Sequence, residues 1–199
     1  MGSGHGGGFS LRPSPSHQGL ICTFTHADLA LKFLDSSLVQ AYRDRAAEFW
    51  SGVLTVQSAR GYWDKQSWLA TAPDAVAVQP GFEGPLAVLT RASILPSKAM
   101  AFWRYAPAAQ AELSQSDGCL LSMGLGEAPL VRQCTFSLWR DTAAMSKFAH
   151  KGAHQVASSA AYKHEFFSES MFVRMRVLEM SGAWQGQNLH KQAMEFSHA

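Results

Sequence analysis

A pattern that occurs twice in the chain limits the folds open to it more than any other feature. Cys22-Thr23-Phe24 recurs as Cys134-Thr135-Phe136, and each copy follows a glycine-rich stretch and precedes a helical pattern. Each helical pattern then gives way to a strand-like run that closes on Gly-x-Trp, at Gly61-Tyr62-Trp63 and at Gly182-Ala183-Trp184. Landmarks that repeat in the same order are typical of a duplicated unit. The sequence therefore predicts two related halves.

The second copy contains the pattern of a complete unit. In chain order, its periodicity and turn residues predict a strand at 85–95, a helix from Pro96 that Pro107 kinks or splits, strands at 119–125 and 130–139, a helix capped by Asp141, and a strand at 172–180. This βαββαβ order is that of the split βαβ, or ferredoxin-like, unit. We therefore expect an α+β fold built from ferredoxin-like units.

The first copy is incomplete. It predicts only a glycine-rich turn, a strand at 20–26, a helix at 27–50 and a strand at 53–59. The strand and helix that would open the unit are missing from the pattern, and that strand is central in a ferredoxin-like sheet, so its loss would expose unpaired backbone groups. Two explanations stay open. Either Met1 is a late start and some 40 further residues precede it, or the first half is rebuilt around another element.

These patterns also predict how the chain is divided. We expect an incomplete ferredoxin-like half at 1–63, a linker at 64–84 that is rich in breakers and poor in periodicity, a complete half at 85–184, and a loose polar tail at 185–199.

Composition excludes several classes of function. The formal net charge of +2 is too small for a nucleic-acid surface. No apolar run approaches the roughly 18 residues that span a bilayer, and the N-terminus lacks a signal pattern. Cys22, Cys119 and Cys134 are scattered in apolar runs without a Cys-x-x-Cys pair. This usage predicts reduced core thiols in a cytosolic protein and argues against a zinc site made of cysteines.

Two histidines lie four residues apart in the second helical pattern of the second half. His150 and His154 share a helix face away from the apolar stripe, which by itself favours two solvated side chains. Glycine costs about 1 kcal/mol relative to alanine inside a helix, so Gly152 is expected to break the helix. His154 would then begin a second helix and face a cavity between helix and sheet, where a neutral imidazole suits haem iron. A zinc peptidase motif fails because Lys151 stands where glutamate is required.

Arginine and tryptophan side chains offer further candidates. Arg91 and Arg132 lie in or beside apolar elements, and a buried arginine needs an anion. The anion is either a carboxylate of a ligand or an internal acid, the candidates being Glu127 and Asp141. Aromatic residues are core residues by default, but they would equally line a pocket for a flat or long apolar ligand, among them Trp103 and Trp139.

Several long blocks resemble the spheroidene monooxygenase family of carotenoid-oxidising bacterial enzymes. They are LTRASILPSKAMAFWRYAP, GLGEAPLVRQCTFSLWRDTAAMSKFAHKGAH and SESMFVRMRVLEMSGAWQG, with GFSLRP, YRDRAAEFW and ARGYW fitting in the first half, so the resemblance runs from Gly2 to Gly186. It implies a duplicated ferredoxin-like barrel of the dimeric α/β barrel type. It also implies a haem-containing monooxygenase that uses O₂ and electrons from a reduced ferredoxin to introduce a keto group at the end of a linear carotenoid.

The resemblance also assigns a ligand. The family's Gly-small-His pattern falls on Gly152, Ala153 and His154, which makes His154 the axial ligand of the haem iron and the catalytic residue, with His150 as the alternative. Two departures stand out. The family's first strand and helix have no counterpart in this chain, and Ala153 occupies a position where proline is expected, so the restart of the helix is less forced.

The remaining expectations concern the cofactor pocket and the partners. Arg91 and Arg132 are expected to anchor the haem carboxylates, and Trp103 and Trp139 to line the pocket. The expected location is the cytoplasm, at most peripheral to the inner membrane; the oligomeric state stays open, a homo-oligomer being one alternative. Two alternatives stay open: a related haem enzyme that acts on a smaller substrate, and a barrel that binds haem or another hydrophobic molecule without turnover.

Overall fold

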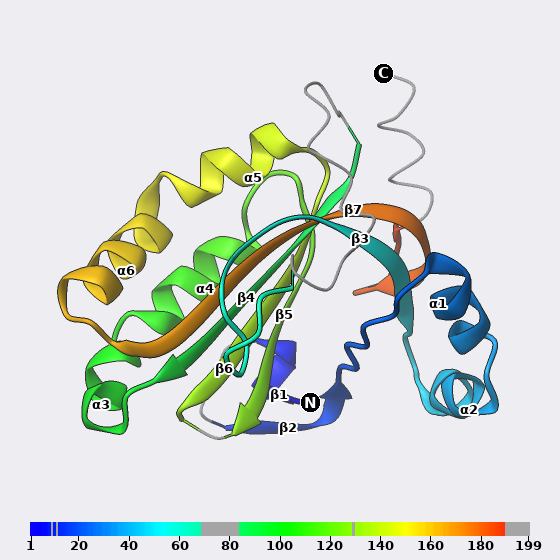
Figure 1. Ribbon diagram of the computed structural model, residues 1–199, viewed down its shortest axis with the longest axis horizontal. Helices are drawn as coiled ribbons and strands as arrows, with labels where there is room; N and C mark the ends of the chain where they lie inside the picture. The colour runs from blue at the N-terminus through cyan, green and yellow to red at the C-terminus, as the bar shows by residue number, and fades with distance from the viewer. Residues whose placement is uncertain (9, 11, 69–83, 129, 190–199) are drawn as a thin grey trace.

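The computed structural model describes residues 1–8, 10, 12–68, 84–128 and 130–189 (Figure 1). Its strands are β1 (Gly2–Gly4), β2 (Pro13–Gln18), β3 (Trp50–Gly61), β4 (Leu86–Ile94), β5 (Cys119–Ala128), β6 (Arg132–Trp139), β7 (Phe167–Trp184) and β8 (Gln187–Asn188). Its α-helices are α1 (Ala27–Leu34), α2 (Ser37–Arg45), α3 (Ala99–Phe102), α4 (Ala106–Ser114), α5 (Thr142–Ala149) and α6 (Gly152–Lys163), with 3₁₀ helices at His5–Gly7 and Pro96–Lys98.

The second half forms a complete ferredoxin-like unit. β4, α3 with α4, β5, β6, α5 with α6, and β7 follow one another in βαββαβ order. The four strands lie side by side in the order β5-β6-β4-β7, and each neighbouring pair is antiparallel. This is the strand order of the split βαβ unit. The α+β class and the ferredoxin-like fold expected from the sequence are therefore confirmed.

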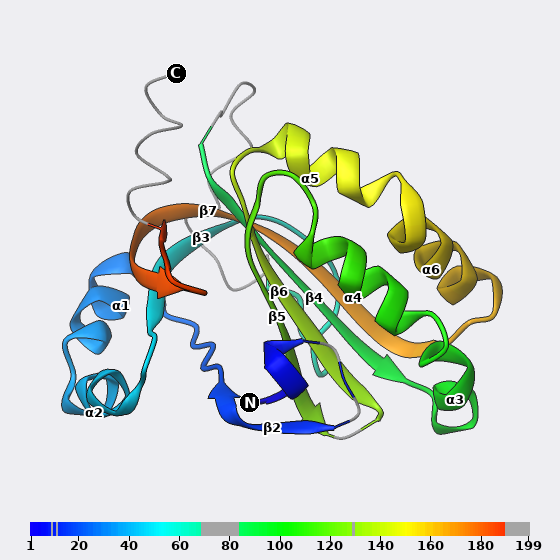
Figure 2. The ribbon, with the colours of Figure 1, turned by 180° about the vertical axis from the view of Figure 1, so that it is seen from behind.

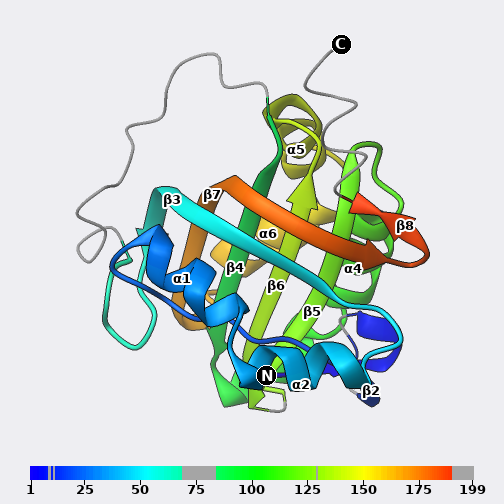
Figure 3. The same ribbon diagram turned by 90° about the vertical axis from the view of Figure 1, so that its right-hand side faces the viewer.

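The first half extends both edges of the same sheet. β1 and then β2 continue it beyond β5, and β3 continues it beyond β7, which gives the order β2-β1-β5-β6-β4-β7-β3. β7 is long enough to hold two partners: Phe167–Arg176 lies along β4, and Met171–Gly182 lies along β3. Figure 3 shows β3 and the far end of β7 crossing over one face of the sheet, with α4, α5 and α6 on the other.

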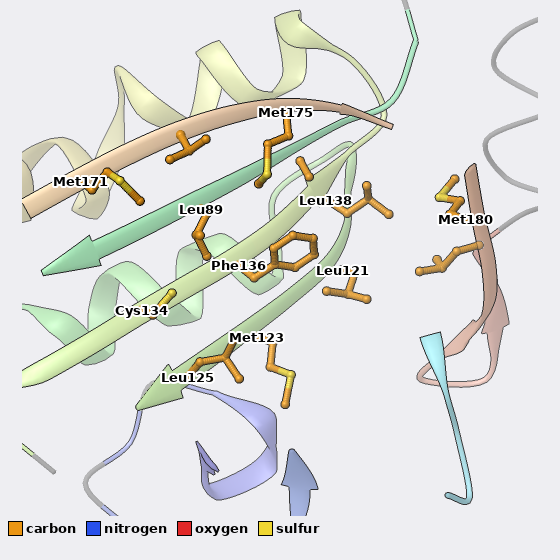
Figure 4. Packing of buried hydrophobic residues seen from close by; sticks show 13 residues of the cluster. Leu89, Leu121, Met123, Leu125, Cys134, Phe136, Leu138, Met171, Met175 and Met180 are labelled. Atoms are coloured by element: carbon orange, nitrogen blue, oxygen red, sulfur yellow. The ribbon is translucent and has the colours of Figure 1, made fainter. Parts of the chain in front are cut away.

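The two faces of the sheet carry different cores because side chains alternate along a strand. We call the face covered by β3 and the end of β7 the inner face; Ala87, Leu89 and Val173 belong to its core. Figure 4 shows this core, in which methionines stand out: Met123, Met171, Met175 and Met180. The opposite face, here called the helix face, carries Leu86 and Val88, which pack with residues of α4 and α5.

The first half departs from the expected elements at two places. Residues 20–26 form no strand; Ile21 instead packs on the inner core, and Phe24 packs on Phe33 with ring centroids 5.5 Å apart. The strand lies earlier, in β2, whose two prolines suit the sheet edge because proline donates no ladder hydrogen bond. The expected helix at 27–50 is two helices, and the Ser36 hydroxyl caps the second by accepting from the Val39 N–H at 3.4 Å.

In the second half the expected elements are present, but the first helix breaks slightly before Pro107, where the break was expected. The helix after β4 is split at Trp103–Tyr105, and Pro107 lies in the first turn of α4, where a missing N–H costs nothing. Asp141 caps α5 as expected, because its carboxylate accepts from the Ala144 N–H at 2.7 Å. The break predicted at Gly152 is confirmed, since α5 ends at Ala149 and α6 begins at Gly152.

A carboxylate from α4 stabilises this break. Gly152 has φ +64°, and the Oε2 atom of Glu112 accepts a hydrogen bond from the His154 N–H at 3.1 Å, which satisfies one of the free donors of the first turn of α6. A Cβ atom on residue 152 would overlap the Glu112 carboxylate. Glycine therefore suits this φ, and a larger residue would also have to displace the end of the Glu112 side chain.

Arg91 is fully buried on the inner face and is surrounded by acids. Its Nε and Nη2 atoms lie 3.3 Å from the two carboxylate oxygens of Glu127, its Nη1 contacts Glu169, and its Nη2 lies 3.4 Å from Asp64. Glu169 also accepts from the backbone N–H groups of Asp64 and Lys65 at 2.9 and 2.8 Å. Arg91 and Glu169 thus fasten the turn that follows β3 to the sheet, and Glu127 is the internal acid that the sequence offered as its partner.

Cys22 is exposed, so its assignment to the core is wrong; burial raises the pKa of Cys119 and of Cys134 to about 12.

Most of the expected linker, at 69–83, and residues 190–199 of the expected tail lie outside the described residues, and the proposed divisions stay predictions. Among the helices that the structure describes, none has the length and apolarity needed to cross a membrane.

Replacing Gly152 by alanine is expected to destabilise the protein by about 1–3 kcal/mol, because alanine strains at this φ and displaces the Glu112 carboxylate. Urea unfolding of the two proteins measures the difference. Gly126→Ala is the control, since its Cβ would make only ordinary contact with Gln133. Equal stability of Gly152→Ala and wild type would contradict the role given to this glycine.

Replacing Arg91 by methionine is expected to cost about 3 kcal/mol at neutral pH, because three carboxylates lose their shared cation. Burial raises the pKa of Glu169, but the N–H groups of Lys65 and Asp64 and the charge of Arg91 outweigh it, so the pKa lies below its ordinary value. Such a carboxyl stabilises the fold at neutral pH and loses this effect as the pH falls below about 4.3. The stability difference should therefore narrow in acid; a difference independent of pH would contradict the account.

Candidate functional site

The structure places the candidate residues from the sequence in three separate groups. His154 and Trp139 lie on the helix side of the sheet. Arg91 and Arg132 belong to the inner-face network, where Arg132, with 45% of its side chain exposed, lies 3.5 Å from Asp64 and 3.9 Å from Glu127. Trp103 packs in a cluster next to α3, and its Nε1 donates to the Leu130 carbonyl at 3.1 Å. The sheet therefore separates the two arginines from the histidine.

His154 is half-buried in the first turn of α6, with its ring orientation set by neighbours. Its Nδ1 lies 3.4 Å from the Ala149 carbonyl oxygen, and its ring centroid lies 4.6 Å from that of Phe148. Burial lowers its pKa below the ordinary value, and the charge of His150 adds to this; the Ala149 carbonyl and the Glu112 carboxylate act in the opposite direction. The net result favours the neutral imidazole, the form that binds metals.

His150 differs from His154 in each of these respects. It is the C-cap residue of α5 and is exposed, and its Nδ1 lies 2.8 Å from the Ser146 carbonyl oxygen on its own helix. The break at Gly152 lets the two histidines face different surroundings, so only His154 lies against the aromatic residues of the helix side.

These aromatic residues connect His154 to the sheet. The Phe148 ring lies between His154 and Trp139, with its centroid 5.3 Å from that of Trp139. Trp139 is 1% exposed and its Nε1 donates to the Ser137 hydroxyl at 2.9 Å, so its only polar atom is satisfied. Phe172 of β7 packs against the same cluster. One side of the His154 ring thus faces an aromatic, apolar cluster.

The sheet beneath this layer is not fully covered. Thr90 lies in the middle of the sheet, between Thr135 of β6 and Phe172 of β7, and on the helix face, yet it is exposed. On the same face of β4, Val88 at 6% and Ala92 at 8% exposure are buried on either side. We call Phe172, Thr90, Thr135 and Gly124, which are paired across four strands, the Thr90 row.

Exposure along the Thr90 row is centred on Thr90, because Thr135 and Phe172 are half-buried and Gly124 is buried. α4 and α6 pack against each other on this side of the sheet (Figures 1 and 2). A side chain in the middle strand of a sheet remains exposed only where the covering layer leaves space above it. Thr135, which neighbours Thr90 on β6, is also small, which adds to that space.

Arg174 and Arg176 are the charged residues that the sequence reasoning missed. They lie on the helix face of β7, because Arg174 pairs with Val88 and Arg176 pairs with Leu86. The signal was present in the sequence: in FVRMRVLEM the two arginines alternate with Val173 and Met175, which point to the inner core. Period-two alternation in a predicted strand assigns them to the face opposite that core.

Two open hollows lie elsewhere, beside the turn that Arg91 holds. One, of about 500 Å³, is lined by residues that include Trp63, Trp68, Asp64 and Glu127, and the rings of the two tryptophans stack with centroids 5.3 Å apart. The other, of about 580 Å³, is lined by residues that include Tyr62 and Glu169. Neither is lined by His154.

Solved structures resemble the chain over about half its length. Rv0793 from Mycobacterium tuberculosis aligns with a TM-score of 0.43 and 17% identity, covering 48% of this chain and 96% of that protein. SnoaB from Streptomyces nogalater, a cofactor-independent oxygenase, aligns with a TM-score of 0.36 and 13% identity, covering 53% of this chain and 97% of its own. No protein-family model matches the chain.

Named relatives match nearly the whole chain. The spheroidene monooxygenase of Rubrivivax gelatinosus is 46% identical over 187 residues, which are 94% of this chain and 70% of that protein. The spheroidene monooxygenase of Rhodobacter capsulatus is 34% identical over 189 residues, 94% of this chain and 77% of that protein. That of Cereibacter sphaeroides is 30% identical over 191 residues, 94% of this chain and 57% of that protein. The chain belongs to the spheroidene monooxygenase family.

Proposed function

We propose that the protein is a carotenoid monooxygenase that holds haem on the helix face of its second half, with His154 as the axial ligand. Membership of the spheroidene monooxygenase family supports the reaction and the substrate class. The observation that carries the cofactor assignment is the position of His154, a neutral, partly buried imidazole at a restarted helix beside an incompletely covered sheet.

The imidazole of His154 suits an axial ligand. With its proton on Nδ1, facing the Ala149 carbonyl, its Nε2 is left as the metal-binding atom, which is the usual arrangement of a ligating histidine. Glu112 fixes the backbone of His154 through its N–H group. The chain's own contacts therefore set the direction of the ring before any metal is bound.

The surroundings also suit a flat apolar group. Phe148 lies against His154, Phe172 belongs to the same cluster, and the Thr90 row leaves space above the sheet. Arg91 and Arg132 already contact carboxylates on the inner face. The proposal therefore gives them no contact with the cofactor.

A redox cofactor is required because side-chain acids and bases do not oxidise a carotenoid C–H bond, and haem supplies O₂ activation when bound. Converting one methylene to a ketone consumes two O₂, four electrons and four protons and releases three waters, through two hydroxylations at one carbon and loss of water from the geminal diol. Reduced ferredoxin is the proposed electron source. Phe148, Trp139 and Phe172 exclude water from the apolar side of the site.

Titrating purified protein with hemin tests the cofactor assignment. Wild type is expected to give a saturable, sharp Soret band. His154→Gly should weaken hemin binding at least about tenfold, which is 1.4 kcal/mol, and free imidazole should restore the wild-type spectrum because it can occupy the vacated position. His150→Gly should bind like wild type.

The opposite patterns would contradict the proposal. Loss of the band in His150→Gly alone would transfer the ligand role to that residue. No band in wild type would remove haem from the account. If the band is normal but no ketone forms in the presence of a linear carotenoid and reduced ferredoxin, the protein binds haem but does not catalyse the proposed reaction.

A further inference from the structure

The helix face of β7 carries a positive charge whose anion is not part of the described chain. Arg174 is half-buried. On the adjacent strand β4 it pairs with Val88, a buried residue of the apolar cluster. Within the part of the chain that the structure describes, its Nε atom is buried and has no hydrogen-bond partner. Its guanidinium lies 5.6 Å from the centre of the Phe172 ring.

Among the described residues, Arg91, the buried arginine of the inner face, differs from Arg174 in having ion-pair partners. On the inner face, three carboxylates surround its guanidinium. The guanidinium of Arg174 is only half-buried, but its Nε donor is withdrawn from water without an acceptor in the described chain, which costs free energy, so a bound anion is expected in the functional state. Arg176 lies next on the same face of β7, and Arg60 of β3 pairs with Phe172, so two further arginines lie near Arg174 on this face.

The position of Arg174 connects this charge to the site of His154. Phe172, which the guanidinium covers, is a member of the Thr90 row and packs with the cluster that contains Trp139 and Phe148. A flat molecule above the Thr90 row would thus have His154 and its aromatic neighbours on one side and Arg174 at its edge.

We propose that Arg174 binds a carboxylate at the edge of the flat apolar ligand of this site, and specifically a propionate of haem. This inference rests on the proposed function. Arginine suits the task because its planar fork binds a carboxylate through two parallel hydrogen bonds. The residue is a binding residue, and its charge replaces the anchoring role that the sequence assigned to Arg91 and Arg132.

The test compares hemin with hemin dimethyl ester, in which both carboxylates are blocked, by titration in the Soret region. Wild type is expected to bind hemin roughly tenfold tighter than the ester. Arg174→Met should weaken hemin to the affinity of the ester and leave ester binding unchanged. Arg174→Lys should restore part of the preference, because it keeps the charge and loses the fork. Arg132→Met, on the other face, should keep the full preference.

Thermal unfolding without hemin provides a second readout. Arg174→Met should be at least as stable as wild type in the absence of ligand, because it removes a buried Nε donor that lacks a hydrogen-bond partner among the described residues. It should gain less stability than wild type when hemin is added. A clear loss of stability in Arg174→Met without hemin would show that the arginine is structural and would overturn the proposal.

The remaining outcomes separate this inference from the function on which it rests. Equal binding of hemin and ester by wild type, an unchanged preference in Arg174→Met, or a preference lost in Arg132→Met would each overturn the carboxylate contact while haem binding stands. If wild type binds neither hemin nor its ester, the haem assignment fails, and the contact fails with it.

Discussion

The alternation of side chains along β4 and β7 is the constraint on which the arrangement of the site depends. Both strands have neighbours on each side, so their side chains point either to the inner face or to the helix face. This places Arg91 among carboxylates within one core and Arg174 beside an apolar cluster on the other side. A shift of one residue in the pairing would exchange these environments. Which residues can meet one ligand is therefore decided by strand register more than by distance along the chain.

The helix face owes its chemistry to a break in a helix. The extended conformation of Lys151 and the left-handed conformation of Gly152 separate α5 from α6; in one continuous helix His154 would remain one turn beyond His150 on the same face. The break also requires a partner for the free N–H groups of α6, and Glu112 supplies it from a neighbouring helix. The same carboxylate fills the space above Gly152. One contact between α4 and α6 thus fixes both the start of the second helix and the place of the imidazole.

The sequence predicted those features that depend on neighbours along the chain. The βαββαβ order, the Asp141 cap and the break at Gly152 follow from periodicity, capping and backbone preference, and all are present. It failed where distant residues decide. The run 20–26 reads as a strand, but of its residues only Ile21 packs on the inner core and the others are exposed, while a proline-containing segment takes the edge position. Cys22 belongs to this run and is exposed with it.

Only part of the candidate site could be predicted from the sequence. The partner of Arg91 could be named, since Glu127 was a candidate, but the face on which the pair lies depends on the register of β4. Arg174 could have been found by applying period-two alternation to FVRMRVLEM, because apolar residues define the core side of that strand. The exposure of Thr90 could not, since it depends on how two helices cover the sheet.

A crystal structure of the protein with bound hemin would show whether the helix face of the second half holds the cofactor. We expect iron bonded to the Nε2 atom of His154, with the porphyrin above Thr90 and Phe172. Iron bonded to His150, or a porphyrin lodged on the inner face beside Trp63 and Arg91, would contradict this expectation.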